Sequence, residues 1–355
     1  MWKAFIALIG HRFLLFLTAF LVINAKLPST TSGVLPQLHP TKEILSKGLQ
    51  RIFEGPEFAR LDKAMAFPPS AIFKSDSDPF LWMARWLVAI TGLSPHLILI
   101  LLSNLFFLIF LSELFATLSR MVPTEVAEGA LLLLILWPTS YEMSVGSSWA
   151  MTSCLATVVI REAMDNRWLI GGIAMGLLTL QHPLAVGLIP LLAYLFWYFQ
   201  RHFLAWQILK RASFFLIPLG IALFFRWSEL PSFKETLSQS ALWNVAHVIQ
   251  TAGKGASWTF SQSFSGQTLT ILFFAIGAGV SLFSHSGFLH RILPLHMLLL
   301  LLLYTPYGGI ASRASLAASC LAGISSASSP IVNRAIQMLL LLLSLYEVGV
   351  VFSYA

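Results

Sequence analysis

Three aspartates in one polar stretch are the side chains of this sequence best suited to acid–base chemistry. Asp62, Asp76 and Asp78 lie between residues 26 and 79, and the last two form an Asp-Ser-Asp before Pro79. A carboxylate there can deprotonate an acceptor hydroxyl, or can hold a divalent cation through its oxygen atoms. The run KSDSDP also consists of ordinary turn residues, so a solvated turn is the alternative interpretation.

Three basic side chains near the ends of apolar runs are candidates for binding an anionic group. Arg313, in YGGIASRASLAA, is costly against lipid and fits a lipid phosphate with its planar fork, although snorkelling to the headgroups would also satisfy it. His182 can donate to a phosphate or sugar as a neutral imidazole, or is a plain helix-turn residue. Arg226 is an interfacial anchor or a phosphate contact. Glu142 is either a second acid or a helix-end charge.

Motifs of soluble enzymes and of metal sites are missing from the sequence. It contains no Walker loop, no GxGxxG after a strand, no GxSxG and no HExxH. The two cysteines, Cys154 and Cys320, lie in apolar stretches, so no disulfide framework is indicated, and no CxxC or zinc spacing occurs. A membrane enzyme without a nucleotide cradle would most simply take its donor from the lipid phase.

The composition points to lipid as the solvent of most of the chain. Of 355 residues, 57% are hydrophobic and only 10% are charged, against about 25% charged in an ordinary soluble domain. The formal charge of +7 and the pI of about 9.6 do not indicate nucleic acid, because the basic residues are scattered between apolar runs. We therefore expect an all-α, polytopic transmembrane helical bundle over residues 1–355, a single integral membrane domain.

Apolar runs of about the length of a membrane crossing predict roughly eleven spans. The first, over 4–24, has the outline of a signal peptide, but Arg12 and its length favour an uncleaved helix. Residues 80–90 form an aromatic segment at the interface. The remaining runs are 94–118, 125–141, 148–160, 168–180, 184–199, 212–225, 267–284, 292–304, 309–327 and 335–354.

The distribution of Lys and Arg between these runs predicts the orientation of the bundle. Alternate short connections hold basic residues: Arg120, Arg161, Arg167, Arg201, Lys210, Arg211, Arg291 and Arg334. The opposing turns 142–147, 181–183 and 305–308 hold none, which satisfies the positive-inside rule for a cytoplasmic N-terminus. The longer stretches 26–79 and 227–266 then form two external loops. The host membrane would be a bacterial inner membrane or one of the ER type.

Two stretches resemble those of a known family. RWLVAITGLSPHLILILLSNLFFLIFL, from Arg85 to Leu111, is similar to that family's segment after its first loop, and residues 134–192, which begin LILWPTSYEMSVGSSWAM, resemble its central block. Arg313 with SRASLAA resembles its late arginine span. The family is the GT-C class of integral membrane glycosyltransferases, nearest the GPI mannosyltransferase II type. The resemblance covers about half of the chain.

The sequence departs from that family at the positions that carry its chemistry. No Trp-Asp pair occurs between residues 26 and 60, SDSDPF replaces an aromatic-Pro motif, SSWAM replaces a Tyr-x-Glu, and His182 stands where relatives have Arg. Either Asp62 or the pair of Asp76 and Asp78 has then taken over the role of base, or the chain has drifted from catalysis.

The resemblance implies an inverting transfer of a hexose such as mannose from a polyprenyl-phosphate-linked donor. An outer aspartate would activate the hydroxyl of a lipid or glycan acceptor, with the donor phosphate near Arg313, His182 and Arg226. No metal is required, and a divalent cation at Asp76 and Asp78 is optional. The rival hypothesis is a non-catalytic GT-C-shaped scaffold, or a flippase or transporter of a lipid substrate. Membrane lipids are partners under either hypothesis.

Overall fold

A computed structural model of the chain describes residues 2–24, 78–144, 146–201, 203–226, 233–243, 266–283, 287–305, 310 and 313–353. Within these ranges the regular structure is entirely helical, with no strand, as the composition predicts. Of the predicted external loops, 26–79 is described only at residues 78 and 79, and 227–266 at residues 233–243 and 266. Asp62 and Asp76 lie outside the described residues.

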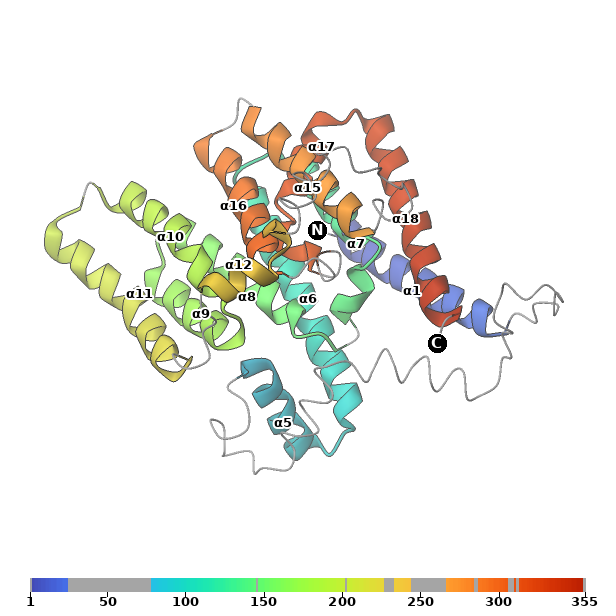
Figure 1. Cartoon of the computed structure of the whole chain (residues 1–355), viewed down its shortest axis with the longest axis horizontal. Coiled ribbons are helices and arrows are strands. Elements are labelled where there is room, and N and C mark those ends of the chain that lie inside the picture. Colours follow the sequence, from blue (N-terminus) through green and yellow to red (C-terminus); the bar gives the residue numbers. More distant parts are fainter. Residues whose placement is uncertain are drawn as a thin grey trace.

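Figure 1 shows the arrangement of the described helices, with α9, α10 and α11 lying together at the left. The described elements, in chain order, are α1 (Trp2–Asn24), α5 (Pro79–Thr91), α6 (Pro95–Leu118), α7 (Thr124–Ile135), the 3₁₀ helix η1 (Ser140–Ser144), α8 (Trp149–Met164), α9 (Trp168–Gln181), α10 (Leu184–Gln200), α11 (Ala205–Arg226), α12 (Phe233–Gln239), α15 (Gly266–Phe283), α16 (Phe288–Tyr304), the 3₁₀ helix η4 (Ala314–Ala317), α17 (Cys320–Ala327) and α18 (Pro330–Ser353).

Local sequence signals explain where α5 and α6 begin. Each has a proline in its first turn and a side-chain cap before it, from Asp78 for α5 and from Ser94 for α6. Gly92 ends α5 in the left-handed region, at φ 66°, where a glycine carries no steric penalty. The expected start of the helix at residue 94 therefore differs from the observed one by a single residue.

Glycines allow two helix pairs to pack at nearly backbone contact. A Cβ on Gly172 of α9 would lie 2.6 Å from the carbonyl oxygen of Phe214 in α11. A Cβ on Gly323 of α17 would lie 2.0 Å from the carbonyl oxygen of Gly277 in α15. These distances are shorter than any non-bonded carbon–oxygen contact, so both crossings need residues without a side chain.

The first helix is packed into the bundle against α18 and α7. His11 Nε2 lies 2.8 Å from Ser344 Oγ of α18, and Arg12 donates from Nη2 to the carbonyl oxygen of Ser140 at 2.8 Å. These polar contacts hold α1 against segments that lie far away in the sequence. In Figure 1, α1 and α18 cross at the edge of the molecule opposite α10 and α11.

Among the described residues, two helices are long and apolar enough to cross a membrane, Pro95–Leu118 and Ala205–Arg226. Their most apolar windows have mean hydropathies of 2.4 and 1.8. Two predicted spans differ from the structure. The run expected over 125–141 is helical in α7 only as far as Ile135, and the 3₁₀ helix η1 begins at Ser140. Residues 309–327 are not one helix over the part described, because η4 and α17 are separated by a turn at Ala318 and Ser319.

Candidate functional site

A guanidinium, an indole and an imidazole lie in contact at one end of the bundle. The guanidinium carbon of Arg313 lies 4.4 Å from the ring centroid of Trp149, and the Trp149 and His182 rings lie 4.8 Å apart. Trp149 begins α8, His182 follows α9, and Arg313 precedes η4, so three helix ends supply the three side chains. A cation within about 6 Å of an indole face is attracted to its π electrons.

A second arginine approaches the same point from α11. Arg226 donates from Nη1 to the carbonyl oxygen of Thr179 at 3.4 Å, one turn before His182. Burial of His182, together with the charges of Arg313 and Arg226, lowers the pKa of its imidazole to about 3. The backbone N–H of Leu184 donates to His182 Nδ1 at 3.1 Å, so the neutral ring carries its proton on Nε2. We name Arg313, Trp149, His182 and Arg226 the cationic cluster.

Asp78 is the one predicted acid of the first loop that the structure describes, and it lies beside the end of α9. The backbone N–H of Phe80 donates to Asp78 Oδ1 at 2.9 Å and also to Gln181 Oε1 at 3.3 Å. Gln181 precedes His182 in the chain, so Asp78 lies at the end of α9 from which His182 of the cationic cluster comes. Asp78 is 1% exposed.

Buried hydroxyl groups continue the polar region between α8 and η4. Ser153 and Ser315 share a hydrogen bond of 2.8 Å between their Oγ atoms, and Ser315 Oγ also lies 3.5 Å from the sulfur of Met143. Glu142 precedes Met143 in η1. The helix η1, which carries Glu142 and Met143, packs against the middle of α6, because Asn104 of α6 donates to the carbonyl oxygen of Ser144 at 2.8 Å.

The other end of the same helices holds a separate ionic network. Arg161 pairs with Glu113 at 2.6 Å and also with Glu162, and Arg120 pairs with Asp165. The 14 residues of α9 separate this network from His182 by about 21 Å, at 1.5 Å per residue. Arg120 and Arg161 both act on the carboxyl of Glu113, and their predicted side of the membrane stays a prediction.

The described residues hold no group of three or more His, Cys, Asp or Glu side chains arranged for a metal ion. Asp62 and Asp76, which were considered for a cation, fall outside the ranges searched. The optional cation therefore stays a prediction for that loop.

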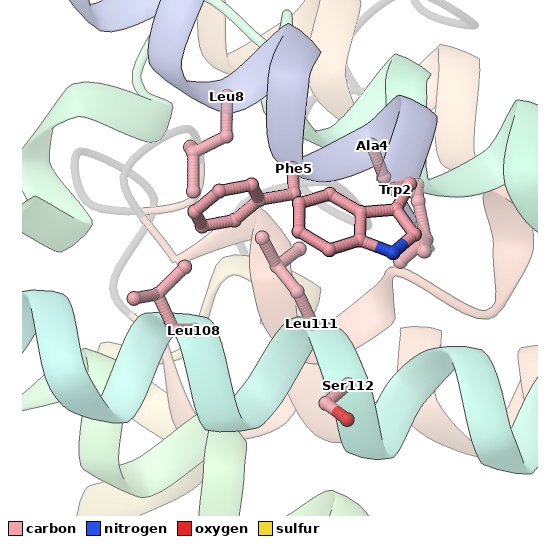
Figure 2. A pocket seen from close by; sticks show the side chains of 8 residues that line it. Trp2, Ala4, Phe5, Leu8, Leu108, Leu111 and Ser112 are labelled. Carbon is pink, nitrogen blue, oxygen red and sulfur yellow. The ribbon is translucent and has the colours of Figure 1, made fainter.

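An apolar cavity of about 310 Å³ lies between α1 and α6. Figure 2 shows Phe5 and Leu8 of the first helix facing Leu108 and Leu111 of the second. The lining side chains that the structure describes include no titratable group. This cavity is therefore unsuited to proton transfer and is distinct from the cationic cluster.

Two residues of the site are missing from the sequence-based prediction. Trp149 contacts both Arg313 and His182, and Gln181 Oε1 accepts a hydrogen bond from Phe80 N–H in the helix that Asp78 caps. Trp149 follows SS in the segment SSWAM, so a tryptophan at a helix start near an external turn was the available signal. Gln181 had a weaker one, as an amide at the end of an apolar run.

Comparison of the chain with protein-family models, with curated proteins and with solved structures gives no match.

Proposed function

We propose that this chain is an integral membrane glycosyltransferase that moves a hexose, such as mannose, from a polyprenyl-phosphate-linked donor to an acceptor hydroxyl on the outer face. The observation that carries the proposal is that Asp78 and the cationic cluster both lie at the end of α9, through Gln181 and His182. A base and an anion-binding group are the two elements that transfer from a sugar phosphate requires.

Outward apolar side chains support the membrane part of the proposal. On α11, Leu216 is 57%, Ile221 55% and Phe224 80% exposed in the isolated chain. Contiguous exposed apolar surface of this kind is unfavourable in water and favourable in lipid. We infer a multi-pass bundle of about eleven spans with its N-terminus in the cytoplasm.

The cationic cluster is suited to a lipid-borne phosphate. Arg313 presents a planar fork of N–H donors that matches phosphate oxygens, and its position over Trp149 limits its conformations. His182, neutral with a proton on Nε2, adds one donor and no charge beside the phosphate, and this donor can serve the phosphate or the sugar that it carries. Arg226 raises the local positive potential from the side of α11.

In the proposed reaction, an outer carboxylate takes the proton of the acceptor hydroxyl while the acceptor oxygen bonds to the sugar's anomeric carbon. The bond from that carbon to the phosphate oxygen breaks with inversion, and the polyprenyl phosphate leaves with its charge stabilised by Arg313. Asp78 is the described candidate for the base, and Asp62 and Asp76 are the others. No protein-bound metal is needed for this balance.

The test is transfer from radiolabelled polyprenyl-phosphate hexose in membranes that contain the protein. Asp62→Asn, Asp76→Asn and Asp78→Asn are compared with Asp165→Asn, whose partner Arg120 lies at the opposite end. Asparagine caps helices about as well as aspartate, so Asp78→Asn removes the charge and leaves the start of α5 intact. We expect one of the three outer variants to lose at least 100-fold in rate, with expression unchanged.

A non-catalytic scaffold is the second candidate, favoured by one observation. Asp78 is fully buried and its carboxylate already caps α5, which is a structural role. The two candidates differ in the same assay, because a scaffold predicts no transfer by the wild-type protein. Equal transfer by all three outer variants would instead exclude these aspartates as the base.

A further inference from the structure

A small polar cavity of about 120 Å³ adjoins the cationic cluster through His182. It lies where the turn between α9 and α10, the helix α12 and the end of α16 meet. Its polar wall consists of His182, Thr236, Gln239, Ser240, Tyr304 and Thr305. The backbone N–H of Ala241 donates to the carbonyl oxygen of Thr305 at 2.9 Å, which fixes the segment after α12 on the end of α16.

Thr305 contributes a buried hydroxyl with no hydrogen-bond partner among the residues that the structure describes. The residue is 0% exposed and lines the cavity. An unpaired polar atom away from water costs free energy, so native proteins rarely keep one without a reason. A polar group within the cavity would satisfy it.

The cavity carries no formal charge at neutral pH. Its described lining residues include no Asp, Glu, Lys or Arg, and His182 stays neutral. Its backbone-bound Nδ1 leaves Nε2–H as the donor that the ring can offer. The wall therefore presents hydroxyls, an amide and one N–H, a set that suits an uncharged, hydroxylated ligand.

We propose that this cavity is the subsite for the sugar of the lipid-linked donor, with the hydroxyl of Thr305 and Nε2–H of His182 contacting sugar hydroxyl groups while the phosphate lies at Arg313. The inference rests on the proposed function. At roughly 30 Å³ per water molecule, the volume suits one hydroxylated edge of a hexose ring. The remainder of the ring would face the acceptor.

Thr305→Val tests the subsite because it removes the hydroxyl and keeps the shape of the side chain. The matched control is Thr117→Val, at a 2% exposed threonine whose Oγ1 donates to the carbonyl oxygen of Glu113 at 2.8 Å. Binding of polyprenyl phosphate and of polyprenyl-phosphate mannose to the purified full chain is measured by calorimetry, without turnover.

We expect the wild-type protein to bind the mannose-bearing lipid at least 10-fold more tightly than polyprenyl phosphate. Thr305→Val should lose that difference and keep its affinity for polyprenyl phosphate, whereas Thr117→Val should keep both. An undiminished preference in Thr305→Val would overturn the subsite and leave the proposed function standing. Failure of the wild-type protein to bind either lipid would overturn the function, and the subsite with it.

Thermal unfolding of the ligand-free variants gives a second readout. Thr305→Val should melt at the same temperature as the wild-type protein or higher, because no hydrogen bond is lost with an unpaired hydroxyl. Thr117→Val should melt at a lower temperature. An equal fall in both variants would mean that the Thr305 hydroxyl is already satisfied by water, which contradicts the proposal.

Discussion

At the scale of single residues, the cationic cluster depends on one stacked guanidinium. Arg313 and Arg201 both lie over aromatic rings, at 4.4 Å from the Trp149 centroid and 5.0 Å from the Tyr198 centroid. Arg201 follows α10 at the end opposite His182, so it offers the same type of contact away from the site.

Arg313→Lys should therefore weaken donor binding, because an ammonium keeps the charge and loses both the planar fork and the stacking. We expect the KM for the lipid-linked donor to rise about 10-fold, which corresponds to about 1.4 kcal/mol. Arg201→Lys should change it less than twofold. Equal effects of the two substitutions in the transfer assay would remove Arg313 from the phosphate site.

His182 should make the folded state sensitive to acid. Its pKa is about 3 in the folded protein, so between pH 6.5 and 3 an unfolded chain binds a proton that the folded chain does not. The free energy of unfolding should fall with decreasing pH in this window, by up to about 1.4 kcal/mol per pH unit from this residue.

His182→Gln removes the titrating imidazole, so the free energy of unfolding should depend less on pH. We would measure the unfolding midpoint of both proteins in detergent between pH 7.5 and 5. The stability of the variant relative to the wild-type protein should increase as the pH falls below 6.5. Parallel profiles for the two proteins would show that His182 titrates normally.

At the scale of elements, the packing of α15 on α17 depends on two glycines. A Cβ at Gly323 would meet the carbonyl oxygen of Gly277 at 2.0 Å, whereas a Cβ at Gly279, on the same α15, meets nothing within 4 Å. Gly323→Ala should destabilise the bundle by about 1–3 kcal/mol or more through overpacking. Gly279→Ala should be neutral or slightly stabilising, since alanine favours helix. Thermal unfolding in detergent compares them, and similar midpoints would argue against the close crossing.

Helix boundaries could be predicted where one local signal decides them. The run expected over 94–118 is observed over Pro95–Leu118, because Ser94 and Pro95 define the start and the run continues unbroken. The segment 309–327 was expected to be one helix because its average hydropathy is high. Hydropathy does not register the competition of serine hydroxyls with the backbone, and the described part divides into η4 and α17.

The site could be predicted only in part for a related reason. Arg313 and His182 were candidates as costly polar groups at the ends of apolar runs, which is a property of the sequence. The contact of Trp149 with both of them depends on how α8, α9 and η4 pack together, and no local pattern contains that information. Thr305 was missed because a single threonine after a helix is too common to stand out.

At the scale of the whole molecule, the orientation of the bundle is a prediction that the chain's own cysteines make easy to test. Cys154 and Cys320 are buried, at 3% and 0% exposure, so the unsubstituted protein should react little with a thiol label. Arg167→Cys marks the end with the ionic network, where the arginine side chain is 61% exposed, and Ser238→Cys marks the exposed side of α12. An impermeant maleimide added to sealed cells should label position 238 only. Labelling of both positions, or of 167 alone, would contradict the topology.

The unequal lengths of α6 and α9 have a consequence for the surrounding lipid. At 1.5 Å per residue, the 24 residues of α6 reach about 36 Å, and the 14 of α9 only about 21 Å, against a hydrocarbon core of about 30 Å. In a bilayer, the acyl chains beside α9 would have to shorten or tilt to meet it. Such local thinning would bring the headgroup plane closer to Arg313. The phosphate of the proposed polyprenyl donor could then reach Arg313 while the lipid stays in its leaflet.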